Sequence, residues 1–140
     1  MSAETFLDTN IFIHHLDSTD SAKHATAELL VRDALSEGNA CISFQVVQEC
    51  LNVVLCKAQV ALPLDAARSH LDTVLAPLME VPASAALYHR ALVVQTRWRF
   101  GFYDSLIVAA ALCAGCSTLL SEDLQLAQRI EGLTIVNPFR

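Results

Sequence analysis

The sequence predicts an α/β fold: a three-layer α/β/α sandwich with a central, mainly parallel sheet. Short apolar segments alternate with longer segments of helical periodicity, which is typical of a parallel sheet covered on both faces. Of the 140 residues, 54% are apolar and only 17% are charged, so many elements must be buried on more than one side. No repeat or linker-like stretch divides the chain, and residues 1–140 are expected to form one domain.

The first part of the chain contains two short apolar strands, each followed by a helical segment. Ala27, Leu30, Val31 and Ala34 recur at helical spacing, and Gly38 is a typical helix end. The elements expected here are a strand over Thr5–Asp8, one or two helical turns over Asn10–Leu16, a helix from Asp20 or Ser21 to Gly38, a strand over Ala40–Ser43 and a nearly apolar helix over Phe44–Lys57.

The second part continues the alternation. Pro63 is suited to starting a helix, because the first helical position needs no backbone donor. The elements expected here are a helix from Pro63 through Val74, a strand over Leu78–Val81, helices over Ser84–Arg97 and Tyr103–Ala114, and strands over Ser117–Ser121 and Leu133–Val136. The helix from Tyr103 has no polar residue after Ser105, so it should be buried on most sides.

Charge and targeting signals limit the possible functions. The net charge is −6, so a nucleic-acid ligand would have to be held by a local basic patch, by metal ions or by both. The N-terminus has no signal-peptide pattern, and the longest apolar run, Leu106–Ala114, falls short of the roughly 20 residues that span a bilayer. We expect a cytoplasmic protein that does not enter a membrane. Its five cysteines lie in apolar segments and are expected to be reduced core thiols.

Four acidic residues stand where solvent-exposed helix faces do not account for them. Asp8 ends the first predicted strand and Asp123 follows the strand near Ser121, so both belong to the carboxyl edge of the sheet. Asp104 opens a buried helix. Glu49 lies in the apolar helix after the second strand, on a polar stripe with Gln45, Gln48 and Asn52. The four carboxylates are therefore expected to converge.

Converging carboxylates repel one another unless a cation neutralises them. Oxygen ligands without convincing His or Cys partners favour Mg²⁺ or Mn²⁺ over Zn²⁺. Such an ion can activate water and clamp a phosphate, so the expected chemistry is phosphodiester hydrolysis.

Each acid also has an ordinary structural explanation. Asp8 and Asp104 could each cap a helix, Glu49 could belong to a buried ion pair, and Asp123 could be an exposed loop residue like its neighbour Glu122. What favours the functional interpretation is that one edge of one sheet accounts for all four.

The residues in question resemble a known family over nearly the whole chain. The sequence is similar to PIN domains, in the branch of VapC toxins. The resemblance is carried by the order and spacing of five segments: FLDTN at the start, SFQVVQE ending at Glu49, FGFYDSLIVAAAL with Asp104, LLSEDLQ with Asp123 and GLTIVNP near the end.

This resemblance implies a metal-dependent ribonuclease that uses Mg²⁺ or Mn²⁺. The family's acidic residues correspond to Asp8, Glu49, Asp104 and Asp123, its small hydroxyl residue to Ser121, and its polar residue after the first acid to Asn10. It also implies a homodimer and, for the toxin branch, a cognate antitoxin that blocks the active site. By position alone, Thr9 and Ser43 are further supporting candidates, although ordinary strand-end hydrogen bonding is the simpler explanation for Ser43.

Residues 96–104, TRWRFGFYD, could bind RNA. Arg97 and Arg99 alternate with aromatic residues just before Asp104, and guanidinium groups and aromatic rings bind phosphates and unpaired bases. The alternative is that Trp98 and Phe100 are core residues and the arginines are solvated. His14 and His15 lie near Asp8 and could transfer protons, but exposed helix positions are the more ordinary explanation.

Two other functions remain open. A haloacid-dehalogenase-like phosphatase also begins with an Asp after its first strand, but it generally has a second Asp two residues later, where this chain has Asn10. A non-catalytic module could bind RNA or protein through the same edge.

Overall fold

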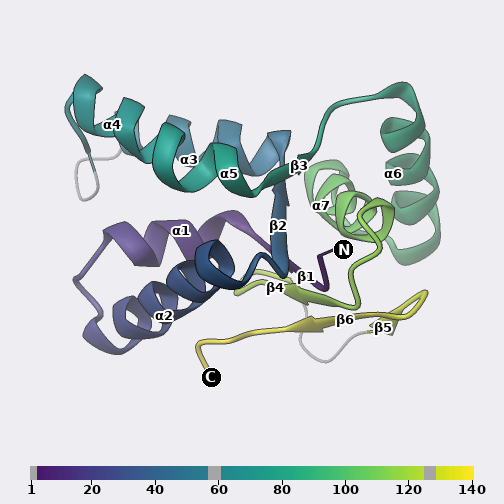
Figure 1. Ribbon diagram of the computed structural model, residues 1–140. Helices are drawn as coiled ribbons and strands as arrows, with labels where there is room; N and C mark the ends of the chain where they lie inside the picture. Colours follow the sequence, from purple (N-terminus) through teal and green to yellow (C-terminus); the bar gives the residue numbers. More distant parts are fainter. Residues whose placement is uncertain (1–2, 57–60, 125–128) are drawn as a thin grey trace.

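The computed structural model describes residues 3–56, 61–124 and 129–140 (Figure 1). Within them, six strands form one sheet in the order β3-β2-β1-β4-β6-β5. The strands are β1 (Thr5–Leu7), β2 (Ala40–Ser43), β3 (Met79–Val81), β4 (Thr118–Leu120), β5 (Arg129–Ile130) and β6 (Leu133–Val136). The helices are α1 (Thr9–Leu16), α2 (Ser21–Glu37), α3 (Phe44–Cys56), α4 (Leu64–His70), the π-helix η1 (Leu71–Leu75), α5 (Ala76–Leu78), α6 (Ala85–Trp98) and α7 (Phe102–Cys113).

The predicted three-layer architecture is confirmed. The chain steps from β1 through β2 to β3 in one direction and then returns through α6 and α7 to β4 on the other side of β1. Right-handed crossovers therefore place α1 to α5 on one face of the sheet and α6 to α7 on the other. Figure 1 shows the α6–α7 pair lying apart from the remaining helices.

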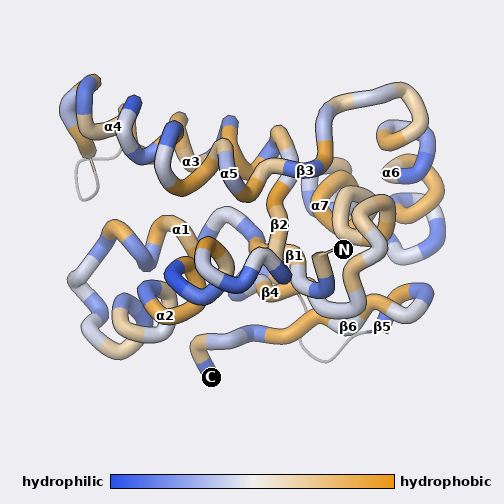
Figure 2. Tube along the Cα trace, in the orientation of Figure 1, coloured by the Kyte–Doolittle hydropathy of each residue, from blue (hydrophilic) through white to orange (hydrophobic). Residues whose placement is uncertain are grey.

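The core is built on the sheet and the helices next to it. Phe6 of β1, Ile42 of β2 and Leu119 of β4 are fully buried, as is almost all of α7 between Ser105 and Ala111. Figure 2 shows hydrophobic stretches along β2 and β6 and hydrophilic residues on α2. Strands buried on both faces give the site a rigid base.

The structure corrects several sequence-based boundaries. The short strand β5, which pairs antiparallel with β6 through a turn at Glu131 and Gly132, was not predicted. The helix from Pro63 continues through the π-helix η1 to Leu78, so Leu78 is helical and not part of the following strand. Asp8 lies just after β1 instead of within it. Lys57, the expected end of α3, is outside the described residues.

The prediction that all five cysteines are core thiols is wrong for two of them. Cys56 and Cys113 are exposed because each lies at the end of its helix. Cys41 and Cys116 are buried and their sulfur atoms lie 3.8 Å apart. Cys116 therefore packs against a cysteine of the sheet strand β2.

The described helices include none that is both long and apolar enough to cross a membrane.

Candidate active site

The topology marks one place on the sheet where a site is expected. In open parallel sheets, ligands bind beyond the carboxyl ends of the strands, where neighbouring connections leave to opposite faces. Here that point lies between β1 and β4, which pair side by side in parallel. Asp8 follows β1, and the segment Ser121–Asp123 follows β4.

Asp8 is a buried carboxylate with two fixed hydrogen bonds. Its Oδ1 accepts from the backbone N–H of Thr9 at 2.7 Å, and its Oδ2 accepts from the hydroxyl of Ser121 at 2.8 Å. Asp8 is the N-cap of α1, as the structural alternative proposed, but only 7% of it is exposed. Burial raises its pKa to about 6; the two hydrogen bonds oppose that rise, and the Glu49 and Asp123 carboxylates add to it.

Ser121 connects the two strand ends through a single hydroxyl group. While donating to Asp8, the fully buried Ser121 Oγ accepts from the backbone N–H groups of Asp123 and Leu124, each at 3.3 Å. The hydroxyl therefore fixes both the Asp8 carboxylate and the turn that carries Asp123. Ser43, the other serine that the sequence suggested, is buried with an unpartnered Oγ and does not line the site among the described residues.

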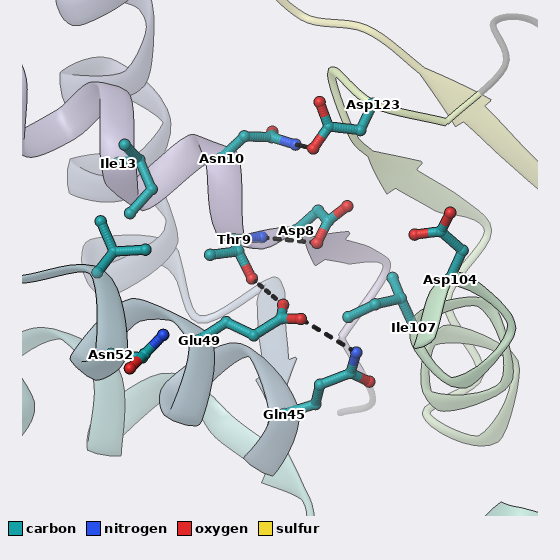
Figure 3. Close-up of a pocket in the computed structure, with 11 residues that line it drawn as sticks. Asp8, Thr9, Asn10, Ile13, Gln45, Glu49, Asn52, Asp104, Ile107 and Asp123 are labelled. Carbon is teal, nitrogen blue, oxygen red and sulfur yellow. Dashed lines mark hydrogen bonds between the residues drawn. The ribbon is translucent and has the colours of Figure 1, made fainter. Parts of the chain in front are cut away.

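Glu49 reaches the same cavity from α3 (Figure 3). The hydroxyl of Thr9 donates to its Oε1 at 2.5 Å, and Gln45 Nε2 contacts its Oε2 at 3.4 Å. Gln45 Nε2 also donates to the backbone carbonyl of Tyr103 at 3.1 Å, which links α3 to the start of α7. The structure gives Glu49 no ion pair among the described residues, so the buried ion-pair explanation does not apply to the part of the chain that is described.

Asp123 and Glu122 are adjacent in sequence but have different partners. Asn10 Nδ2 donates to Asp123 Oδ2 at 3.2 Å, and Asn10 Oδ1 accepts from the Glu122 N–H at 3.2 Å. The Glu122 side chain instead binds His14 Nε2 at 2.9 Å and Lys23 Nζ at 2.6 Å. Asp123 is thereby the one that faces the cavity. The prediction that His14 occupies an exposed helix position is wrong. His14 is half-buried, and its ring contacts the Glu122 carboxylate.

Asp104 lies in the first turn of α7 and is exposed at the open side of the cavity. It is not the helix cap, because Gly101 occupies that position. Partial burial and the nearby Asp123 and Glu49 carboxylates raise the pKa of Asp104. In Figure 3 its carboxylate points toward Asp8, on the side of the cavity opposite Asn52.

Together these side chains line a cavity of about 360 Å³. Its described lining consists of Asp8, Thr9, Asn10, Ile13, Gln45, Glu49, Asn52, Val53, Asp104, Ile107 and Asp123. The cavity thus contains all four predicted acids, and none of these lining residues is cationic. A buried, uncompensated carboxylate such as Asp8 is costly, and the missing positive charge is what a cation would supply.

The donor set fits a hydrated Mg²⁺ or Mn²⁺ ion. All the side-chain ligands are oxygen atoms, and the amides of Asn10, Gln45 and Asn52 add further polar groups at the wall. Within residues 3–56, 61–124 and 129–140, no three His, Cys, Asp or Glu side chains are close enough to hold an ion by themselves. Mg²⁺ usually keeps several water ligands and uses only one or two carboxylates directly, so this open arrangement suits it.

The two arginines proposed for RNA binding have different surroundings. Arg99 lines a second cavity that includes Asp104 and Asp123, whereas Arg97 lies on the outer face of α6 beside Leu92. Sequence reasoning missed this separation. It also missed the contact of Lys23 with Glu122, because residues 99 positions apart give no local signal of it.

The comparisons with known proteins bear on the family and the fold. Residues 5–131 match the family model described as the PIN domain. The chain belongs to the PIN domain family. No curated protein sequence matches it closely.

Solved structures similar to this PIN domain include toxin–antitoxin proteins. A toxin–antitoxin complex from Klebsiella pneumoniae is 18% identical, with a TM-score of 0.65, covering 96% of this chain and 98% of that one. VapC20 from Mycobacterium tuberculosis, a sarcin-ricin loop cleaving toxin, is 21% identical, with a TM-score of 0.64 and coverage of 86% and 90%. VapBC2 from Rickettsia felis, bound to a promoter DNA fragment, is 23% identical, with a TM-score of 0.63 and coverage of 94% and 96%. These likenesses establish the shared fold.

Replacing Asp8 with Asn should stabilise the metal-free protein at neutral pH. A raised pKa means that the Asp8 charge destabilises the fold above pH 6 and has no effect below about pH 4. In EDTA at pH 8, Asp8→Asn should raise the free energy of unfolding, by up to about 3 kcal/mol, and the gain should disappear near pH 4. Urea unfolding at both pH values measures this.

Two variants control for other effects of that substitution. Asp8→Ala also loses the cap and the Ser121 contact, so it should gain less than Asp8→Asn. Asp33→Asn, on the exposed face of α2, should change little at either pH. An Asp8→Asn protein that is less stable than the wild type at pH 8 would mean that the negative charge itself supports the fold.

Mn²⁺ or Mg²⁺ should raise the thermal unfolding midpoint, because an ion that binds only the native state stabilises it. At an ion concentration of about one hundred times the dissociation constant, the gain is about 2.7 kcal/mol. Most of this shift should be absent in Asp8→Asn and Asp104→Asn but retained in Asp72→Asn, an exposed acid of η1. Differential scanning calorimetry measures the unfolding midpoint with and without the ion. An undiminished rise in the midpoint in both Asp8→Asn and Asp104→Asn would contradict the assigned ligands.

Proposed function

We propose that this PIN domain is a metal-dependent endoribonuclease that hydrolyses RNA phosphodiester bonds. The proposal rests on one observation. A single cavity, at the carboxyl ends of β1 and β4, is lined by the four carboxylates of Asp8, Glu49, Asp104 and Asp123. Four carboxylates without a cationic side chain in the described lining are suited to a divalent ion and not to binding an anion directly.

The four acids would have two different roles, according to how deeply each is buried. Asp8 and Glu49 are held by Ser121, Thr9 and Gln45 and would fix the ion's position. Exposed Asp104 and Asp123, at the open side, would meet the ion together with the substrate. When bound, Mg²⁺ or Mn²⁺ lowers the pKa of a coordinated water and neutralises charge on the phosphate.

The open, acidic cavity also favours a polymeric phosphodiester as the substrate. It contains few apolar residues with which to enclose a small organic ligand. The uncompensated acids would repel phosphate until the ion is present, which would make RNA binding at this point depend on metal.

The similar structures support a toxin role. Those from Klebsiella pneumoniae and Rickettsia felis are toxin–antitoxin assemblies, and VapC20 is a toxin that cleaves the sarcin-ricin loop. By analogy of fold, we propose that this chain is the toxin of a type II pair, that a cognate antitoxin blocks its cavity, and that it acts as a cytoplasmic homodimer.

The two alternatives make different predictions. An aspartate-dependent phosphatase would need an acid at the second position after Asp8 and a lysine for phosphate, whereas Asn10 binds Asp123 and the described lining contains no lysine. No observation favours that activity. A non-catalytic RNA-binding module remains the alternative that the following experiment separates.

The test is cleavage of a defined single-stranded RNA by the purified chain in Mg²⁺ or Mn²⁺, followed by EDTA. We expect metal-dependent cleavage that falls at least 100-fold in Asp8→Asn and Asp104→Asn, because each removes one of the oxygen ligands that carry negative charge. Electrophoresis of end-labelled RNA measures the rate.

Matched controls exclude contaminating nucleases and unfolding. Asp33→Asn and Asp72→Asn change the net charge equally but lie on exposed helix faces, so they should cleave like the wild type. Cleavage retained in both site variants would refute the assignment. RNA binding without cleavage would indicate the non-catalytic module, and hydrolysis of a phosphomonoester alone would indicate the phosphatase.

A further inference from the structure

A second cavity, of about 380 Å³, adjoins the acidic one. Its described lining consists of Trp98, Arg99, Phe100, Gly101, Asp104, Asp123 and Leu124. Asp104 and Asp123 line both cavities, so their carboxylates form the boundary between them. A polymer whose phosphate lies at the acids can therefore continue directly into this second space.

Arg99 is the one cationic residue in the described lining of either cavity. It ends α6 in the left-handed conformation, with φ 62° and ψ 32°, where Gly is the usual residue. A side chain with a Cβ costs about 1 kcal/mol in this conformation compared with Gly. Position 99 thus carries a long cationic side chain in a backbone conformation that favours Gly.

Trp98 and Phe100, on either side of Arg99, line the second cavity and also pack against the hydrophobic core. Each is half-buried, packs against the hydrophobic core and lines the cavity. This packing holds the rings in place, so they present fixed apolar surface to a ligand. Fixed aromatic rings and an arginine are what proteins use to bind an unpaired base and its phosphate.

We propose that this second cavity binds one nucleotide of single-stranded RNA next to the scissile phosphate, with Arg99 on its phosphate and Trp98 and Phe100 against its base. The proposal rests on the proposed ribonuclease function and adds the substrate position to it. It predicts that one nucleotide beside the cleavage point is selected.

An acidic peptide is the other ligand that an arginine in this cavity could attract. Asp104 and Asp123 line the same space, and their carboxylates would repel the carboxylates of such a peptide. RNA is favoured because its neighbouring phosphate would lie at the cation site, while its base, which carries no charge, would occupy the aromatic wall.

Arg97 provides a matched control. It lies two residues before Arg99, carries the same charge and is likewise exposed, but it lines a different cavity, with Leu92 and Val93, that contains none of the four acids. Arg97→Ala and Arg99→Gly therefore remove equal charge from two different cavities near one helix end. Gly fits the left-handed backbone at position 99, so the second variant should keep its fold.

The experiment measures cleavage of a randomised pool of short single-stranded RNA in Mn²⁺, with sequencing of the products. Arg99→Gly should lower kcat/KM at least tenfold, mainly through KM, and weaken the nucleotide preference at one position beside the cut. Arg99→Lys should recover part of the loss because it restores the charge. Arg97→Ala should stay within about twofold of the wild type.

Binding of a single-stranded RNA analogue with a non-hydrolysable backbone, measured in Mn²⁺ with Asp8 unchanged, gives a readout that does not need catalysis. By fluorescence anisotropy, Arg99→Gly should reduce the slope of log K against log salt by about 0.7, the value for one phosphate contact on a single strand. Arg97→Ala should leave that slope unchanged. Mn²⁺-induced thermal stabilisation should be the same in all three proteins, because Arg99 is not an ion ligand.

The outcomes separate this proposal from the ribonuclease function. Cleavage by the wild type with an unchanged rate and preference in Arg99→Gly would overturn the nucleotide site and leave the nuclease intact. Equal losses in Arg97→Ala would also overturn it, because they would indicate general charge attraction. Absence of cleavage together with Arg99-dependent RNA binding would support the site while refuting the nuclease.

Discussion

The hydrogen bond from Ser121 to the buried Asp8 carboxylate is the contact on which the rest of the site depends. It joins the ends of β1 and β4, the neighbouring parallel strands whose connections leave to opposite faces of the sheet. The same hydroxyl accepts two backbone N–H groups from the turn that carries Asp123. Asp8 is thus held without a positive partner in the described lining, and the cost of its burial would favour the cation that the proposed function requires.

The supporting polar groups keep the other acids from relaxing away from this charge. Thr9 and Gln45 hold Glu49, and Asn10 holds Asp123. Left free, these carboxylates would move apart into water to reduce their repulsion. The fold therefore holds mutually repelling carboxylates at one edge of the sheet, and an opposite charge placed there would relieve the repulsion.

The sequence was sufficient to predict that the four acids converge at one edge of the sheet and that Ser121 lies beside them. The carboxyl ends of parallel strands meet in space, and apolar flanks mark buried carboxylates. It failed where the outcome depends on a single backbone turn or a distant partner. Arg97 and Arg99 diverge because the chain turns left-handed after Trp98, which no periodicity reveals. Likewise, Gly101 displaced Asp104 from the cap, and β5 is too short to carry an alternating pattern.

The distance along the chain between Asp8 and Ser121 has a consequence for synthesis. The two residues are 113 positions apart, and β1 cannot pair with β4 until the chain has been made as far as Leu120. Such long-range pairing forms late in folding, since the loop must close before the contact is made. During synthesis, a chain that has not yet reached Ser121 therefore has no assembled cavity, because it lacks both the partner of Asp8 and the Asp123 carboxylate.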